Sequence, residues 1–266
     1  MRMRAAVLEE FGEPLVVQEV ELADPAAGEV LVRLVACGVC HTDLYTASGD
    51  DPSGYAPAVL GHEGAGVVER VGEGVTSIAE GDHVVTLFSP QCGECVHCRS
   101  PRTNLCMAIR EQQNKGYLPD GTARLSRDGE EIRHFMGTST FAEYTVMPEI
   151  ALAKVSPEAP LDRACLFACG LSTGLGAAMF TAKVEPGSVC VVFGAGMVGL
   201  GAVAGPACRA PTGSSASTCP RTGSSSPAAR APPTRGSPTT GPSSGCSTRP
   251  AASARTTRSR PPATCA

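Results

Sequence analysis

Short apolar or alternating runs fill the first part of the chain and predict β-strands. Glycine and proline residues separate these runs, as is typical of strands joined by turns. The runs span residues 5–8, 15–20, 29–35, 64–71, 83–88 and 142–147. Short strands at this spacing predict an irregular β-barrel or sandwich.

The pattern changes after residue 160. Residues 161–183 are rich in Ala, Leu and Met and predict a helical segment. Residues 189–193 form a short apolar run, typical of a buried strand, that leads directly into a glycine-rich turn. That combination marks the start of an α/β domain. We therefore expect a mixed α/β chain with one domain over 1–160 and the start of a second over 161–205.

The last 61 residues, 206–266, have a different composition from the rest. They use only Ala, Pro, Arg, Gly, Ser, Thr and Cys, and contain no large apolar side chain. Such a segment cannot bury enough apolar surface to offset the entropy lost on ordering. We expect a low-complexity, disordered tail and a foldable part of about 205 residues.

Charge follows the same division. All 26 acidic and 14 of the 22 basic residues precede residue 206, so the two parts carry −12 and +8. The N-terminus lacks the apolar core of a signal peptide, and the apolar run 189–205 is shorter than the roughly 20 residues of a spanning helix. We expect a cytoplasmic protein with no membrane contact, whose nine cysteines before residue 206 are reduced.

Four of these cysteines are closely spaced in one segment, in the pattern C-x2-C-x2-C-x7-C. They are Cys92, Cys95, Cys98 and Cys106. Four thiolates complete a tetrahedral shell around Zn²⁺ and leave no position for a substrate, which indicates a structural zinc. An iron–sulfur cluster or four unrelated thiols are the alternatives, but the spacing differs from the common ferredoxin patterns.

A second group of metal-binding residue types lies at two strand-to-turn transitions. Cys40 opens the sequence Cys-His-Thr-Asp, and His62 lies within Gly-His-Glu. With a distant second thiolate, this pair would form a three-ligand zinc site with an open position. The residue pattern alone leaves the alternative that both are buried structural residues.

A G-x-G-x-x-G pattern follows the predicted strand at 189–193. Its glycines are Gly194, Gly196 and Gly199. Between a strand and a helix, this pattern predicts a turn that brings the helix N-terminus to a cofactor pyrophosphate. An acidic residue for the ribose is expected about 20 residues later. No Asp or Glu follows Glu185, so the pattern opens a dinucleotide-binding domain that the chain does not complete.

Together these motifs resemble the zinc-dependent medium-chain alcohol dehydrogenases. The resemblance rests on the segments 40–43, 61–72 and 169–174 and the four-cysteine segment, whose order and spacing agree over most of residues 3–205. It implies a GroES-like catalytic domain, an incomplete Rossmann domain, and NAD and two Zn²⁺ per chain as cofactors. Full-length members are homo-oligomers, through contacts in the part that this chain lacks.

The resemblance also implies a role for each site residue. Cys40, His62 and Cys169 would hold the catalytic zinc, which acidifies the bound alcohol so that hydride passes to the nicotinamide. The hydroxyl of Thr42 would hydrogen-bond the alcohol oxygen and pass its proton outward. A carboxylate behind the zinc, a pyrophosphate contact and a nicotinamide contact are implied for Glu63, His41 and Thr173. The alternative for Thr42 and for these three is a polar turn residue.

Within the family, the chain resembles the class III branch, the glutathione-dependent formaldehyde dehydrogenases, over 103–106, 118–122, 136–144 and 182–187. Arg110 matches the arginine that binds the glutathione carboxylate, and a surface charge is the alternative. Asp51 is kept, whereas Ser53 replaces a glutamate of that branch. The implied substrate is a primary alcohol or a thiol–aldehyde adduct such as S-(hydroxymethyl)glutathione.

Because hydride transfer needs a bound nicotinamide, we expect this chain to be inactive without the rest of the cofactor domain. The alternative is a non-enzymatic zinc-binding remnant. A third possibility is nonspecific nucleic-acid binding by the eight arginines of 206–266. No aromatic residue or module supports it, so we expect no nucleic-acid partner.

The composition of the tail is that of a shifted reading frame in a GC-rich gene. With codons chosen freely, residues 207–228 read two bases later as LPGADRIIGVDLSEDRLELA, which resembles the second Rossmann strand of the family with its acidic residue. A genuine basic linker is the alternative. Stop codons in the other frame of the gene would exclude the shift.

Overall fold

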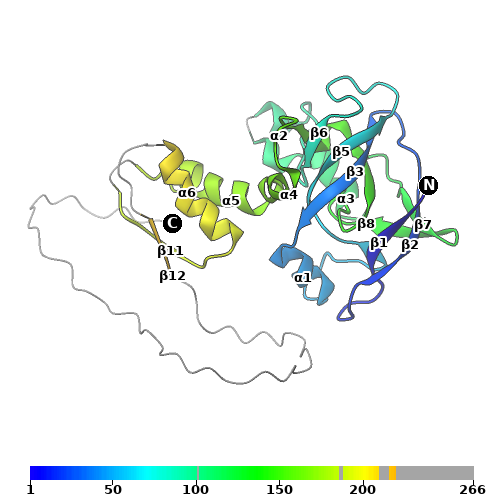
Figure 1. Cartoon of the computed structure of the whole chain (residues 1–266), viewed down its shortest axis with the longest axis horizontal. Helices are drawn as coiled ribbons and strands as arrows, with labels where there is room; N and C mark the ends of the chain where they lie inside the picture. The colour runs from blue at the N-terminus through cyan, green and yellow to red at the C-terminus, as the bar shows by residue number, and fades with distance from the viewer. Residues whose placement is uncertain (101, 186–187, 210–215, 220–266) are drawn as a thin grey trace, which may run out of the picture. The chain divides into compact units, whose positions relative to one another are not determined.

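The computed structural model describes residues 1–100, 102–185, 188–209 and 216–219 of the chain (Figure 1). All of these residues fall within one unit, residues 1–222. Their strands form three sheets: a closed barrel, a five-stranded sheet and a two-stranded parallel pair.

The barrel is built from five short strands in the order β1-β2-β7-β8-β4. They are β1 (Arg2–Leu8), β2 (Val16–Leu22), β7 (Leu125–Arg127), β8 (Glu130–His134) and β4 (Ala58–Val59). All neighbours are antiparallel except β4 and β8, which are parallel and close the barrel. Alternate residues of β1 point inward, among them Met3, Ala5 and Val7, and pack with Val20 and Ile132 in the core. The predicted irregular barrel is confirmed.

Two of the predicted ligands, Cys40 and His62, lie near strand ends of the five-stranded sheet. Its order is β10-β6-β5-β3-β9. The strands are β10 (Leu152–Lys154), β6 (His83–Thr86), β5 (Glu63–Val71), β3 (Glu29–Gly38) and β9 (Tyr144–Pro148). Strand β3 lies between β5 and β9 and pairs antiparallel with both, and Val30, Val32, Val68 and Met147 fill the core beside it.

Short helices connect the strands, and the predicted helical segment at 161–183 is interrupted. The connecting elements are α1 (His41–Ala47), α2 (Val96–Arg99), η1 (Thr103–Leu105), α3 (Met107–Gln113) and η2 (Glu149–Ala151). The interrupted segment consists of α4 (Leu161–Ala164), η3 (Cys165–Ala168), α5 (Gly170–Gly176) and the π-helical turn η4 (Ala177–Thr181). Cys169 breaks it, because its φ of −143° and ψ of −79° lie outside the helical region.

The two-stranded sheet belongs to a β-α-β unit formed by β11 (Cys190–Phe193), α6 (Met197–Arg209) and β12 (Ala216–Cys219). Helix α6 packs closely on α5, since a Cβ on Gly174 would lie 2.0 Å from the Val198 oxygen. Two elements thus reach beyond Gly205, where the sequence predicts none. A strand needs only a backbone partner, which β11 supplies, so the lack of large apolar side chains does not prevent it. Residues 210–215 and 220–266 of the predicted tail lie outside the described residues.

Over the described part of the chain, no single helix has the length and apolar character needed to cross a membrane. The pair Leu161–Ala168 and Gly170–Thr181, bent by 53°, meets the criterion on length and composition only.

The buried His134, at the end of β8, makes a hydrogen bond within the barrel. His134 is completely buried, and its Nε2 accepts a hydrogen bond from the Arg124 backbone N–H at 3.0 Å. The Arg124 guanidinium donates to both carboxylate oxygens of Glu29, at 2.8 and 2.9 Å. Burial and the Arg124 charge lower the pKa of His134 to about 3, so the imidazole stays neutral in the folded protein.

This neutral imidazole makes stability depend on pH. An unfolded histidine titrates near pH 6.5, so the contribution of His134 is complete above that pH and is lost as pH falls towards 3. We expect the free energy of unfolding to drop by about 2 kcal/mol between about pH 7 and pH 5 from this residue. His134→Gln keeps a hydrogen-bond acceptor but cannot titrate. Urea unfolding should therefore show that its free energy of unfolding falls by about 2 kcal/mol less than that of the original protein over this pH range. The exposed His41→Gln is the matched control, and equal slopes in the two variants would contradict the assignment.

Candidate functional site

The predicted catalytic ligands come together from three separate elements. Cys40 lies directly before α1, His62 directly before β5, and Cys169 directly before α5. Their ligand atoms and a carboxylate oxygen of Glu63 all lie within 4.8 Å of one another. Two thiolates and one imidazole, with a carboxylate beside them, form a donor set that fits a catalytic Zn²⁺.

One buried carboxylate, that of Asp43, orients two of these ligands. Its Oδ1 accepts hydrogen bonds from His62 Nδ1 at 3.2 Å and from the Gly61 backbone N–H at 3.1 Å. Its Oδ2 accepts the backbone N–H of Cys40 at 2.9 Å. No sequence pattern assigned Asp43 a role. The available signal was its place as the third residue of α1, where a carboxylate reaches back to the N–H of the residue before the helix.

The charges of these groups are mutually dependent. Burial alone would lower the pKa of His62, but the Asp43 carboxylate and the Cys169 thiolate raise it to about 10. Burial favours the neutral thiol of Cys40, yet hydrogen bonds with Thr42 and the nearby His62 outweigh it and lower the pKa of that thiol. A metal-bound imidazole must be free of its proton, so binding of Zn²⁺ to these residues would release protons.

Two other predicted residues lie against the ligands. Thr42 Oγ1 is 3.5 Å from Cys40 Sγ. The buried Glu63 accepts the backbone N–H of Gly170 through Oε1 at 3.0 Å, which ties the start of α5 to β5. Its Oε2 occupies the space over Gly38, where a Cβ would lie 2.1 Å away. Glycine at 38 is therefore required for the carboxylate to sit behind the site.

The four-cysteine cluster is the second group of potential metal ligands in the described part of the chain. The sulfur atoms of Cys92, Cys95, Cys98 and Cys106 all lie within 4.8 Å of one another, and the Cys95 and Cys98 sulfurs are 3.5 Å apart. Backbone N–H groups point at the sulfurs: that of Cys95 donates to Cys92 Sγ at 3.3 Å. Hydrogen bonds from the backbones of Cys98 and Met107 lower the pKa of Cys95 to about 6. This closed thiolate set fits a structural Zn²⁺.

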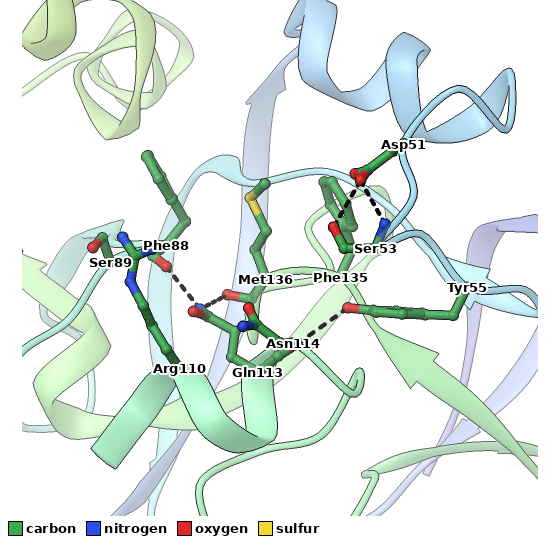
Figure 2. Close-up of a pocket in the computed structure, with 10 residues that line it drawn as sticks. All are labelled: Asp51, Ser53, Tyr55, Phe88, Ser89, Arg110, Gln113, Asn114, Phe135 and Met136. Atoms are coloured by element: carbon green, nitrogen blue, oxygen red, sulfur yellow. Dashed lines mark hydrogen bonds between the residues drawn. The ribbon is translucent and has the colours of Figure 1, made fainter. Parts of the chain in front are cut away.

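A cavity of about 160 Å³ is lined by ten residues (Figure 2), two of which contact the His62 ring. Phe88 and Phe135 line it, and their rings meet His62 edge-on at centroid distances of 5.4 and 5.8 Å. The other lining residues are Asp51, Ser53, Tyr55, Ser89, Arg110, Gln113, Asn114 and Met136. Of these, the sequence predicted only Asp51 and Arg110, because the lining is assembled from helix α3 and from loops that lie far apart along the chain.

The two predicted substrate residues of the cavity carry opposite charges. Asp51 accepts hydrogen bonds from the Ser53 hydroxyl at 2.7 Å and from Thr46 at 3.0 Å. The Ser53 hydroxyl is the main cause of the lowered pKa of Asp51. Arg110, on the exposed face of α3, donates to the Asn104 carbonyl at 3.1 Å. The cavity therefore offers one fixed anion and one cation.

The predicted cofactor residues occupy two different places. Gly194, with φ +103°, and Gly196 form the turn between β11 and α6, as the pattern predicts. Gly199 lies on the first turn of α6, where a Cβ would be 2.0 Å from the Gly194 oxygen. His41 begins α1 and Thr173 lies on α5, both with exposed side chains.

Comparison with known proteins gives a consistent result. Residues 26–157 match the alcohol dehydrogenase GroES-like domain. The chain is 55% identical to an S-(hydroxymethyl)glutathione dehydrogenase of Synechocystis sp. and 56% identical to one of Escherichia coli. Each match extends over 205 residues, which is 77% of this chain. A crystal structure of an alcohol dehydrogenase zinc-binding domain protein from Burkholderia ambifaria superposes with a TM-score of 0.72, at 39% identity, over 77% of this chain and 56% of that chain.

The GroES-like barrel carries one Cys-His-Cys group and one four-cysteine group whose donor sets fit Zn²⁺, which is the class of fold and donor set of the zinc-dependent alcohol dehydrogenases. The matched part of the chain belongs to the zinc-dependent alcohol dehydrogenase family, on the branch that contains the S-(hydroxymethyl)glutathione dehydrogenases. These are oxidoreductases. The chain spans about half the length of the curated relatives it matches, 56% of each.

The two clusters predict independent metal loading. Cys95→Ser removes one of four thiolates from the closed set, so we expect zinc content to fall from about two ions per chain to about one. Elemental analysis by mass spectrometry measures the change. Cys190→Ser, which removes a free thiol from outside both clusters, is the control and should retain both ions. Full zinc content in Cys95→Ser would contradict the four-thiolate assignment.

Proposed function

We propose that this chain carries the catalytic half of a zinc-dependent alcohol dehydrogenase. The observation that supports the proposal is the convergence of Cys40, His62 and Cys169 beside the cavity, with His62 held by Asp43. When bound there, Zn²⁺ supplies Lewis acidity that lowers the pKa of an alcohol. The same reasoning assigns the structural zinc to Cys92, Cys95, Cys98 and Cys106.

The residues around the ligands have distinct tasks in this proposal. Thr42, beside Cys40, accepts the alcohol proton through its hydroxyl and passes it outward. Glu63 places its carboxylate behind the ligands and fixes the start of α5 through Gly170. Phe88 and Phe135 cover the His62 ring and keep water from that side of the site.

We propose a substrate that carries both a positively and a negatively charged group. Asp51 and Arg110 line the same cavity, so they suit the ammonium and carboxylate groups of a thiol–aldehyde adduct such as S-(hydroxymethyl)glutathione. The relatives from Synechocystis sp. and Escherichia coli are named for that substrate. A simple primary alcohol is the second candidate, because Ser53 adds no charge to the cavity.

NAD is the proposed hydride acceptor, and the chain holds only part of its site. Gly194, Gly196 and Gly199 approach the pyrophosphate at the start of α6, His41 contacts it from α1, and Thr173 faces the nicotinamide. The domains of the proposal are 1–160, 161–205 and the tail 206–266. Because no acidic residue after Glu185 can bind the ribose, we propose that the chain by itself does not turn over. We propose a cytoplasmic location and no nucleic-acid partner. The alternative function is that of a non-enzymatic zinc-binding remnant.

The substrate assignment predicts a charge-specific binding defect. Replacing Arg110 by Gln removes a charged hydrogen-bond donor worth about 1.5–3 kcal/mol, so we expect glutathione to bind at least about tenfold more weakly. Isothermal titration of the zinc-loaded chain measures this change. Arg163→Gln, at an exposed arginine on α4, is the matched control. Equal glutathione affinity in both variants would favour the primary-alcohol substrate.

The activity assignment predicts zinc without turnover. The purified chain should contain about two zinc ions and form no NADH from S-(hydroxymethyl)glutathione or a primary alcohol, because its cofactor site is incomplete. Absorbance at the NADH band provides the measurement. NAD-linked turnover by the purified chain would contradict the proposed inactivity.

A further inference from the structure

The carbonyl groups of Gly61 and His62, on either side of the His62 side chain, both accept hydrogen bonds from buried hydroxyl groups. The Gly61 carbonyl accepts hydrogen bonds from Thr138 Oγ1 and from the Thr140 backbone N–H, each at 3.0 Å. The His62 carbonyl accepts Thr86 Oγ1 at 3.2 Å. Thr86 and Thr138 are completely buried. The backbone on both sides of this ligand is therefore held by side chains from outside its own segment.

Thr138 lies in a turn whose backbone is unfavourable by itself. Met136, Gly137 and Ser139 have φ angles of +53°, +66° and +50°. The left-handed region costs a residue with a Cβ about 1–2 kcal/mol, and such a conformation persists only where surrounding contacts compensate for it. The sequence around Thr138 therefore adopts this turn because other interactions require it.

Hydrogen bonds within the turn, and from the turn to the segment that leads into His62, hold this conformation. Ser139 Oγ donates to the Val59 carbonyl at 2.8 Å and accepts the Phe135 backbone N–H at 2.9 Å. The Phe141 backbone N–H donates to the Leu60 carbonyl at 3.0 Å. Three consecutive carbonyls, those of residues 59 to 61, are thus bonded to the turn. Each residue of the segment 59–61 is therefore hydrogen-bonded to the turn.

Close contact at Gly61 makes this arrangement stiff. Gly61 has a φ of +89°, and a Cβ there would lie 2.6 Å from the Phe141 nitrogen and 2.8 Å from Thr140 Oγ1. Glycine is therefore required for this segment to lie so close to the turn. On its other side the Gly61 N–H is bonded to Asp43, which also holds the His62 ring. Movement of the ligand backbone would break bonds on both sides.

Each threonine hydroxyl also connects two segments. Thr138 Oγ1 lies 3.0 Å from the Phe135 carbonyl as well as from Gly61, so its proton is shared between the two carbonyls. Thr86 Oγ1, at the end of β6, accepts the Gly64 N–H at 3.0 Å while it donates to His62. Loss of either hydroxyl leaves buried carbonyl groups with fewer partners.

We propose that Thr138 and Thr86 are positioning residues that set the backbone of His62, and thereby the geometry of the metal site formed with Cys40 and Cys169. The inference rests on the proposed role of His62 as a zinc ligand. Neither hydroxyl bonds to a ligand atom, so each acts through the peptide groups on either side of the imidazole. Outer groups that orient a metal ligand typically change metal affinity by about 10–100-fold when they are removed.

Cadmium-113 NMR with a chelator competition tests this proposal, because a two-thiolate site and a four-thiolate site give separate resonances. Thr138→Val and Thr86→Val remove the hydroxyls and retain the side-chain shape. We expect each to move the resonance of the two-thiolate site and to weaken its affinity by about tenfold. The four-cysteine cluster of the same molecule should keep its resonance and affinity.

Thr138→Ser and Thr86→Ser restore the hydroxyl, so the proposal expects both to regain the original resonance. Ile132→Val is the stability control, since Ile132 is buried in the barrel core and the change costs about 1 kcal/mol. It should move neither resonance. If Thr138→Val does not fold, Thr86→Val tests the same proposal through the other carbonyl.

The outcomes separate this inference from the proposed function. A chain that binds cadmium at the four-cysteine cluster alone would overturn the proposed ligand role of His62. Binding at both sites, with the valine variants and Ile132→Val affecting them equally, would overturn the positioning role and leave the ligand assignment in place.

Discussion

The candidate site depends on the bonds made by one buried carboxylate. Asp43 receives the Cys40 N–H, the Gly61 N–H and the His62 ring, and so fixes the approach of two ligand segments to each other. An unpaired carboxylate would be costly at 2% exposure, and three donors satisfy it. Because the same group also determines which nitrogen of His62 is free, it couples the fold of α1 to the chemistry of the imidazole.

Around that carboxylate, the ligands are held by long-range contacts. Glu63 binds the Gly170 N–H and thereby brings the start of α5, with Cys169, to the start of β5. On the opposite side, the turn containing Thr138 supports the Gly61 carbonyl. These contacts join residues far apart in sequence, so the site forms only when the five-stranded sheet and the segments around it are assembled. The four-cysteine cluster needs no such assembly, since one segment supplies every sulfur.

Several strands could be predicted, because local patterns of apolar and polar residues indicate a strand. The alternating burial of β1 follows directly from its sequence, and the turn at Gly194 follows from its glycines. The break at Cys169 could not be read from composition, since its backbone angles are imposed by the place of the residue in the site. Strands β4, β7, β8, β10 and β12 lie outside the runs that the sequence predicts, because they are short and are defined by backbone pairing with neighbouring strands.

The sequence by itself determined the chemical types: four closely spaced thiols, a Cys-His pair and a glycine turn after a strand. Residue type and short spacing are local properties, so they can be read along the chain. Only the tertiary structure decided that Cys169 joins Cys40 and His62, that Asp43 orients them, and that Asp51 and Arg110 line one cavity. These relations depend on how the strands pair and where the helices begin, and burial makes each of them energetically significant.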